Sequence, residues 1–345
     1  MIPELQDQSL VKTQAYIDGQ WVSGDGGETF PVLNPATGET LAEVASCGAA
    51  ETRRAIAAAE AAQKHWRSLA AKDRSAVLRR WFELIMANQE DLARLMTAEQ
   101  GKILAESRAE IAYAASFIEW FAEEAKRVYG DVIPLPQTDR RGVAIKQPVG
   151  VCAAITPWNF PAAMITRKAG PALAVGCAMV LKPAKETPLS ALALAELADR
   201  AGLPAGLLSV VAGKSSGAIG GELTSNPIVR KLTFTGSTPV GKTLTEQCAA
   251  TMKRTSMELG GNAPVIVFDD ADLDAAVQGA IVSKYRNAGQ TCVCANRLYV
   301  QDGVYDEFVE KFIVATRELV VGRGEEDGVN VGPMISESAI EKVEG

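Results

Sequence analysis

The feature that most constrains the fold is a regular alternation of short apolar runs with longer amphipathic segments, which begins at Val151. Such an alternation is typical of β–α–β units on a parallel sheet, where ligands bind at the carboxyl ends of the strands. The pattern predicts strands over residues 151–155, 178–181, 208–211, 231–234 and 263–268. It predicts helices over residues 162–174, 189–201, 216–224, 241–250 and 272–285. We therefore expect an α/β fold built on a parallel sheet.

The first 150 residues have a different pattern. Short strand signals around Tyr16 and Trp21 flank the turn Asp18-Gly19 and predict a small antiparallel element. Ala-rich amphipathic stretches over residues 49–128 predict a layer of helices. Residues 130–150 are extended and rich in proline, which suits an exposed hairpin better than a buried strand.

The composition excludes several classes of function. The 345 residues are 47% hydrophobic and 22% charged, which is typical of a soluble globular chain large enough for two domains. Thirty-five basic and 42 acidic side chains give a net charge of −7 without a long block of one sign, so no nucleic-acid or anionic membrane surface is expected. The longest uncharged run, residues 147–166, contains three prolines and is not a transmembrane helix.

Cysteine and histidine usage narrows the chemistry further. Six cysteines are no disulfide framework in a chain of this size, and the first ten residues lack the features of a secretion signal, so a reducing, cytoplasmic location is expected. His65 is the only histidine, and it lies at the charged end of an Ala-rich segment, as a surface residue would. Triads, Cys/His pairs and histidine-rich metal sites are therefore nearly excluded, and no metal site is predicted.

A glycine-rich segment follows the predicted strand 231–234. Gly236 to Thr243 matches the phosphate-loop pattern, and Asp269 ends a strand that offers a carboxylate for magnesium, so an ATPase is one interpretation. Against it, Pro239 removes a backbone N–H group that such a loop needs. A weaker prediction survives, that of a strand–helix junction whose N–H groups face a pyrophosphate. A second glycine-rich segment, residues 210–221, lacks the GxGxxG spacing, and either segment also suits an ordinary turn between strand and helix.

Three residues are candidates for catalysis. Cys292 follows a predicted helix and has Arg286 and Arg297 nearby, which favours a reactive thiolate, whereas an isolated cysteine is more often structural. Glu258 ends a strand before two glycines and is either a partly desolvated general base or a salt-bridged loop residue. Asn159 lies between two prolines before a helix, where its amide is rigidly placed or caps the helix.

Five short motifs occur in an order and spacing that resemble the aldehyde dehydrogenase superfamily. They are PWNFP at 157–161, KPA at 182–184, FTGS at 234–237, ELGG at 258–261 and GQTC at 289–292. The resemblance extends across essentially the whole chain. It implies a Rossmann-type cofactor domain with a helical layer in residues 1–128 and 150–257, a bridging and oligomerisation hairpin in 129–149, and part of a second, α/β catalytic domain in 258–345.

The resemblance also implies roles for the candidate residues. Cys292 is then the nucleophile, Glu258 the general base and Asn159 an oxyanion donor in an NAD(P)-dependent aldehyde oxidation through a thiohemiacetal and a thioester. The segment at 236–243 then holds a dinucleotide phosphate and not ATP. The cofactor contacts that it implies are Thr156, Pro157, Trp158, Lys182, Lys185, Gly213, Gly217, Phe234, Gly236, Ser237 and Leu259.

The segments NFPAAMITRK and CVC resemble succinate-semialdehyde dehydrogenases in particular. In that subfamily two arginines, which match Arg167 and Arg286 here, clamp the distal carboxylate of the substrate. A guanidinium group binds a carboxylate bidentately, although each arginine alone also suits a surface salt bridge or a helix C-terminus. A small acidic aldehyde is therefore expected, and the choice between succinate semialdehyde and the five-carbon glutarate semialdehyde stays open.

Two further residues concern the cofactor and the redox state. NAD-preferring relatives often carry a glutamate three residues after the motif lysine, where this chain has Lys185. A lysine attracts a 2′-phosphate, so NADP is favoured over NAD, although the neighbouring Glu186 opposes this effect. The resemblance implies that Cys294 captures an oxidised Cys292 as a reducible disulfide, and the alternative is a small packing residue.

The resemblance finally implies an oligomer and a longer chain. Family members are homodimers or homotetramers. By comparison with the family pattern, about a quarter to a third of a full-length member lies beyond residue 345, including a cofactor contact, part of the aldehyde pocket and a strand that pairs with a partner's hairpin. The expected activity is therefore that of the full-length enzyme, and the activity of this chain stays open.

Overall fold

The computed structural model describes residues 2–344 and is built around a seven-stranded sheet with the order β11-β10-β7-β8-β9-β1-β2. Its parallel part consists of β7 (Val151–Ile155), β8 (Met179–Lys182), β9 (Leu208–Val210), β10 (Val229–Thr235) and β11 (Arg254–Glu258). β1 (Ala15–Ile17) and β2 (Gln20–Val22) continue the sheet beyond β9 in antiparallel pairing. The central strands are short, apolar and buried, as parallel strands covered on both faces are.

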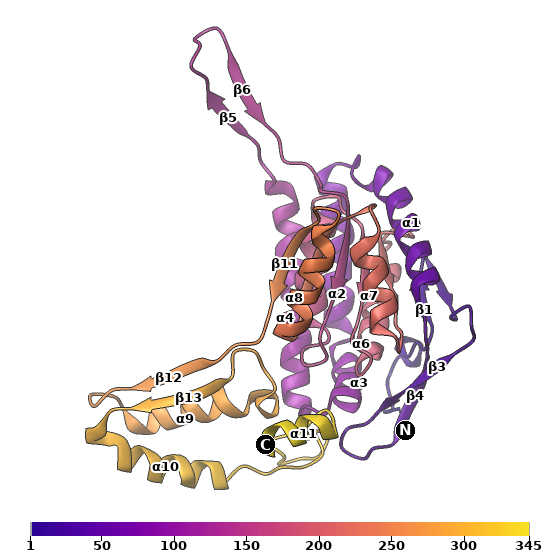
Figure 1. Cartoon of the computed structure of the whole chain (residues 1–345). Helices are drawn as coiled ribbons and strands as arrows, with labels where there is room; N and C mark the ends of the chain where they lie inside the picture. The colour runs from indigo at the N-terminus through magenta and orange to yellow at the C-terminus, as the bar shows by residue number, and fades with distance from the viewer. Residues whose placement is uncertain (1, 345) are drawn as a thin grey trace.

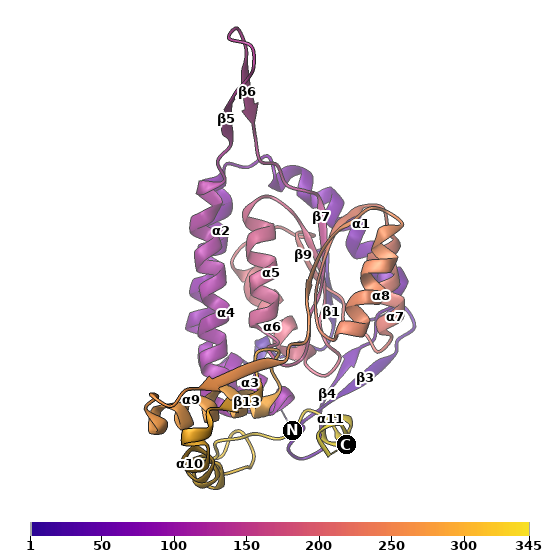
Figure 2. The ribbon, with the colours of Figure 1, turned by 60° about the vertical axis from the view of Figure 1, so that its left-hand side comes forward.

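Helices cover both faces of this sheet (Figures 1 and 2). On one face lie α5 (Ala163–Ala174) and α6 (Pro188–Arg200), backed by α2 (Ala71–Ala87), α3 (Gln89–Gln100) and α4 (Leu104–Glu124). On the other face lie α1 (Ala49–Trp66), α7 (Ser216–Ser225) and α8 (Thr238–Ala249). The strand order reverses between β7 and β10, and such a reversal is where open α/β sheets bind ligands.

Two antiparallel pairs lie outside the large sheet. β3 (Thr29–Leu33) pairs with β4 (Thr40–Ala45). β5 (Asp131–Pro134) pairs with β6 (Arg141–Ala144) in a hairpin that projects from one end of the molecule (Figures 1 and 2). The predicted hairpin over residues 130–150 is therefore confirmed.

The end opposite the hairpin carries residues 263–344 (Figures 1 and 2). β12 (Ala263–Val267) pairs in parallel with β13 (Ala295–Val300), next to α9 (Leu273–Tyr285) and α10 (Tyr305–Arg317), and α11 (Glu337–Glu344) follows. Short 3-10 turns lie at Gln8–Leu10, Ala125–Arg127, Arg286–Gly289 and Asp302–Val304. A small hydrophobic cluster around Phe308 holds this part together, separate from the main core.

The predicted α/β fold is confirmed, with one difference in the sheet. The strand predicted over residues 263–268 forms as β12, but it pairs with β13 and not with the strands of the large sheet. The chain leaves the large sheet at the end of β11, and the predicted alternation contained no signal for that departure. Among residues 2–344, no helix is both long and apolar enough to cross a lipid bilayer.

Candidate active site

Two neighbouring strand ends bring the first site segments together. β7 pairs with β10, so the segment that follows β7 begins beside the glycine-rich segment that follows β10. Thr156 leaves β7 with its N–H donating to the Lys182 carbonyl at 3.1 Å. Thr156 is buried, and Pro157 and Trp158 after it are half-buried. The positions expected to contact a cofactor therefore lie at the carboxyl edge of the sheet.

Asn159 connects the end of β7 to the segment of Cys292. Its side-chain Nδ2 donates to the carbonyl of Gln290 at 2.9 Å, and Gln290 precedes Cys292 by two residues. A side-chain amide has two N–H donors, and the second forms no hydrogen bond with a described residue. Asn159 is not the cap of α5, because the first free N–H groups of that helix donate to Glu110. The helix-cap alternative for Asn159 is therefore wrong.

Cys292 lies on an exposed turn between α9 and β13. Its thiol forms no hydrogen bond with a residue of the described range 2–344. The two arginines expected to favour its thiolate point elsewhere. The Arg297 guanidinium donates to the Asn262 carbonyl at 2.7 Å, and the Arg286 guanidinium lies 5.2 Å from the centre of the Phe160 ring.

Glu258 ends β11, and its main chain contacts the cofactor segment. The N–H of Gly236 donates to the Glu258 carbonyl at 3.0 Å. Three residues later, a Cβ on Gly261 would lie 2.4 Å from the Cys292 carbonyl oxygen, so the two backbones touch there. The side chain of Glu258 is exposed, and the expected partial desolvation is absent because β11 is an edge strand that borders an open cavity.

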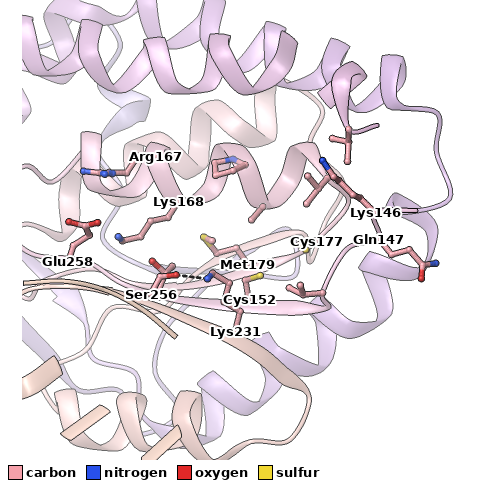
Figure 3. Close-up of a pocket in the computed structure, with 16 residues that line it drawn as sticks. Lys146, Gln147, Cys152, Arg167, Lys168, Cys177, Met179, Lys231, Ser256 and Glu258 are labelled. Carbon is pink, nitrogen blue, oxygen red and sulfur yellow. Dashed lines mark hydrogen bonds between the residues drawn. The ribbon is translucent and has the colours of Figure 1, made fainter. Parts of the chain in front are cut away.

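A cavity of about 490 Å³ lies between α5 and the strands β7, β10 and β11. Figure 3 shows Arg167, Lys168 and Glu258 together at one end of it, and Lys146 and Gln147 at the other. Lys168 donates to the Thr235 hydroxyl at 2.7 Å, and burial lowers the pKa of its ammonium group to about 8. Cys292, Asn159 and Arg286 do not line this cavity.

Arg167 and Arg286 both lie near aromatic rings, and their guanidinium groups form no ion pair with a carboxylate of residues 2–344. The Arg167 guanidinium on α5 lies 5.7 Å from the centre of the Phe117 ring. Neither arginine forms an ion pair with a described carboxylate, so the surface salt bridge considered for Arg167 is not present in residues 2–344. Arg286 directly follows α9, a position where its positive charge also interacts favourably with the dipole at the C-terminus of that helix. Arg167 lines the cavity and Arg286 does not, so their joint binding of an acidic ligand stays a prediction.

The residues at the cofactor position fit a dinucleotide. Lys182 is buried at the end of β8, its ammonium group donates to the Pro183 carbonyl at 3.1 Å, and burial lowers its pKa. An ammonium group with unused donors in a buried position suits ribose hydroxyls. Ser237 is exposed at the start of α8, and its side chain caps no N–H group of that helix. The N-terminus of α8 therefore suits a phosphate.

The other expected cofactor positions divide into two kinds. The Phe234 side chain is buried and packs against Gly236. A Cβ on Gly236 would lie 2.4 Å from the Phe234 ring, so no larger residue fits there. A Cβ on Gly241 would lie 2.5 Å from Leu259, and a Cβ on Gly213 would lie 2.4 Å from the Cys47 carbonyl oxygen. These positions support the site by close packing. Gly217 faces open space, and Lys185 is exposed beside Glu186 at 4.0 Å.

The phosphate-loop alternative loses support in this geometry. Thr238 and Pro239 form the first turn of α8, so one of the N–H groups expected at the phosphate is missing. Lys242 is exposed on α8 and forms no ion pair with a described carboxylate. Among residues 2–344, no group of three or more His, Cys, Asp and Glu side chains is placed to hold a metal ion.

Cys294 and Cys292 are both free thiols in different surroundings. Cys294 is buried, and its thiol donates to the Lys284 carbonyl at 3.3 Å. Cys292, two residues earlier, is exposed. The redox switch between them stays a prediction.

Sequence reasoning missed Lys102, Glu110 and Asn287, which contact the Asn159 segment. Lys102 donates to the Asn159 carbonyl at 2.7 Å, and Asn287 donates to the same oxygen at 3.1 Å. Lys102, Glu106 and Glu110 recur every four residues, a spacing that usually indicates a solvated helix face. Lys102, in the turn before α4, and Glu110, on α4, are buried where this part of the chain packs against α5 and the Asn159 segment, to which the spacing gives no signal.

This chain is similar to known proteins over almost its whole length. Residues 21–345 match the aldehyde dehydrogenase family. Glutarate-semialdehyde dehydrogenase of Pseudomonas aeruginosa is 67% identical over 341 residues, which are 99% of this chain and 70% of that protein. Succinate-semialdehyde dehydrogenase (NADP(+)) of Escherichia coli is 65% identical over 99% of this chain and 70% of that protein.

A solved structure agrees in fold as well as in sequence. The crystal structure of succinate-semialdehyde dehydrogenase from Burkholderia pseudomallei is 62% identical, with a TM-score of 0.98 over 99% of this chain and 71% of that chain. The chain therefore belongs to the aldehyde dehydrogenase family and is an NAD(P)-dependent oxidoreductase.

Proposed function

We propose that this chain carries the nucleophile, general base and cofactor site of a dehydrogenase that oxidises succinate semialdehyde to succinate. One observation carries the proposal, the convergence of three segments at Cys292. The Asn159 amide reaches the Gln290 carbonyl at 2.9 Å, and Gly261 packs against the Cys292 carbonyl. The convergence supports roles for Asn159, Glu258 and Cys292 in one reaction.

Cys292 starts the reaction as the nucleophile. Its exposed thiolate adds to the aldehyde carbon, and the carbonyl oxygen becomes an oxyanion. Two donors suit that oxyanion, the second N–H of the Asn159 amide and the Cys292 main-chain N–H, neither of which donates to a described acceptor. The NAD(P) dinucleotide, held by Lys182 and the N-terminus of α8, supplies the hydride acceptor when bound.

Glu258 completes the reaction as the general base. Its carboxylate takes a proton from the water that attacks the thioester on Cys292, the C–S bond breaks, and the acid is released with the Cys292 thiolate restored; Glu258 then gives its proton to solvent. The hydrogen bond between Gly236 and the Glu258 carbonyl ties this base to the cofactor segment. Lys168 shares the cavity end with Glu258 and presents a positive charge to it (Figure 3).

The acidic end of the substrate is assigned to Arg167 and Arg286. Both guanidinium groups are free of carboxylate partners in the described residues and bind carboxylates bidentately. Glutarate semialdehyde is the second candidate, since one added methylene changes binding by only about 1–3 kcal/mol. The names of the Pseudomonas aeruginosa and Escherichia coli relatives support both acids.

The proposal extends to the cofactor, the location and the assembly. The exposed Lys185 favours NADP over NAD by attracting a 2′-phosphate. Six free cysteines favour a reducing cytoplasm. The full-length enzyme is proposed to be a homodimer or homotetramer, with a cofactor domain of residues 1–128 and 150–257, a bridging hairpin of 129–149 and a catalytic domain from 258 onward.

The test is NADPH formation from succinate semialdehyde by the purified chain and three variants. Cys292→Ala should abolish turnover, whereas Cys248→Ala, which removes a buried thiol of α8, should leave it nearly unchanged. Glu258→Gln should give a burst of NADPH followed by a stall, because the thioester forms but is not hydrolysed. Substantial turnover by Cys292→Ala would overturn the covalent mechanism.

A further inference from the structure

We propose that Lys102 is a positioning residue that holds the main chain of Asn159, so that the Asn159 amide faces the segment of the nucleophile. The inference rests on the proposed function, because Asn159 is the oxyanion donor of that reaction. It also assigns supporting roles to Glu110 and Asn287.

The Lys102 side chain is aimed at Asn159 from the short turn between α3 and α4. It is 1% exposed, and its Nζ donates to the Asn159 carbonyl at 2.7 Å and to the Glu110 carboxylate. The same ammonium group lies 4.2 Å from the centre of the Phe160 ring. Two of its three contacts are therefore with Asn159 and the residue that follows it.

Glu110 holds the residues that follow Asn159, at the start of α5, by hydrogen bonds. Its side chain is 2% exposed and carries the negative charge that Lys102 faces. Its second oxygen accepts the N–H groups of Ala162 and Ala163 at 3.0 and 3.2 Å, where α5 begins. One buried carboxylate thus fixes both the ammonium group and the helix that follows Asn159.

Asn287 closes a ring of hydrogen bonds around the nucleophile segment. Its Nδ2 donates to the Asn159 carbonyl at 3.1 Å and to the Gln290 carbonyl at 3.2 Å. The Asn159 amide donates to that same Gln290 carbonyl. Glu106 accepts the Asn287 N–H at 2.8 Å, which anchors the ring to α4. Lys102 therefore fixes one corner of a ring that ends two residues before Cys292.

The Lys102 side chain is not needed to place its own main chain. Cβ atoms on Gly324 and Gly332 would lie 2.4 and 2.1 Å from the carbonyl oxygens of Lys102 and Gly101, so those backbones already pack together. A buried ion pair is also weak evidence for stability, since an apolar pair of similar volume is often as stable. The contacts of the side chain point to the geometry of Asn159 as its role.

The test removes the ion pair without leaving a buried charge. Lys102→Met with Glu110→Gln keeps the side-chain lengths and a carbonyl oxygen for the α5 N–H groups. We expect kcat for succinate semialdehyde to fall roughly 10²-fold, with the KM for NADP unchanged, because a small misplacement of an oxyanion donor acts on the transition state. In an Asn159→Ala background the same pair of changes should alter kcat less than about threefold, since coupled residues are not additive. Equal losses in both backgrounds would overturn the proposal.

Hydrogen exchange separates this inference from the proposed function. The double variant should exchange faster in peptides covering residues 156–163 and 287–294, with unchanged rates in α10. Unchanged exchange in both segments would refute the positioning role, even if the chain oxidises no aldehyde. Loss of the proposed function alone would appear as no turnover by the unaltered chain.

Two further variants control for folding. Arg108→Gln breaks the exposed Arg108–Glu90 pair between α3 and α4 and should leave kcat and exchange unchanged. Asn287→Gly keeps the left-handed backbone at φ 54° but removes the side-chain donors. It should lower kcat in the unaltered chain and change kcat much less in the Asn159→Ala background. Additive losses for Asn287→Gly would contradict the proposal even if the double variant failed to fold.

Discussion

Glu99 and Glu110 each accept hydrogen bonds from the first N–H groups of a neighbouring helix. Glu99, fully buried at the end of α3, accepts the N–H groups of Leu189 and Ser190 at 2.8 and 2.7 Å, where α6 begins. Glu110 does the same for α5. The helical layer thus caps, from outside the sheet, both helices that follow the strands β7 and β8. This arrangement fixes the two strand ends that carry Asn159 and Lys182.

Glu99 gives a prediction about stability and pH. Burial raises its pKa to about 8 from 4.5 and outweighs the two N–H donors. A carboxyl group whose pKa is raised on folding contributes stability that is complete below pH 4.5 and is lost as the pH rises through about 8. Glu99→Gln, which cannot ionise, should therefore gain stability relative to the unaltered chain between these pH values, by at most a few kcal/mol. Urea unfolding across this range measures the difference, and a constant difference would contradict the raised pKa.

The two arginines give a prediction about substrate choice. A charge-assisted pair contributes about 1.5–3 kcal/mol, which corresponds to roughly tenfold or more in kcat/KM. Arg167→Ala and Arg286→Ala should each lower kcat/KM for succinate semialdehyde by that factor and leave butyraldehyde, which lacks the carboxylate, nearly unaffected. Steady-state kinetics with both aldehydes makes the comparison. Equal losses for the two aldehydes would assign the arginines to folding.

At the scale of residues, the sequence predicts the site residues that lie in short motifs. It does not predict residues whose role depends on tertiary packing. Asn159 and the Cys292 segment are brought together as the five motifs imply. The exposure of Glu258 differs from expectation because β11 lies at the edge of the large sheet, and the contacts of Arg297 differ because β13 pairs with β12. Lys102 and Glu99 are buried by helices distant in sequence, and nothing in their local pattern distinguishes them from surface residues.

At the scale of elements, the contact between the end of β11 and the Cys292 turn depends on a single glycine. A Cβ on Gly261 would lie 2.4 Å from the Cys292 carbonyl oxygen, which is backbone and cannot yield as a flexible side chain does. A Cβ on the neighbouring Gly260 would come no closer than 3.9 Å to another residue, at the Thr238 hydroxyl. These adjacent glycines form a matched pair for a test.

Gly261→Ala should push the two segments apart and lower kcat by roughly 10²-fold, because misplacement of a nucleophile acts directly on the reaction rate. Gly260→Ala should change kcat only slightly. NADPH formation from succinate semialdehyde by the two variants measures the effect, with thermal unfolding as the control for folding. Similar activities for both variants would show that the Cys292 turn adjusts to the added methyl group.

The boundaries of regular elements are predictable where the apolar pattern is local. Strand β7 and the helices α5 to α8 agree with the sequence within about three residues, because their own pattern and caps set their ends. The pairing of β12 with β13 was not predicted, since the polar residues Asn296 and Arg297 interrupt the pattern of β13 and the choice of partner depends on how the chain leaves β11. Pairing is a property of the tertiary structure, which a strand pattern alone does not encode.

At the scale of the whole molecule, the projecting hairpin predicts assembly. Val132 and Val143 face each other across β5 and β6 and are 74% and 69% exposed, and Ile145 beside them is 71% exposed. An apolar strand pair without a covering layer exposes an apolar face and two strand edges and pairs readily with another chain, here the same hairpin of a second copy. Val132→Lys with Val143→Lys should therefore lower the molar mass measured by light scattering to that of a monomer and leave the folded core intact. Val282→Lys, at an equally exposed position on α9, serves as the control and should leave the mass unchanged. A monomeric unaltered chain, or a double variant that assembles as before, would contradict a role for the hairpin in the assembly of this chain.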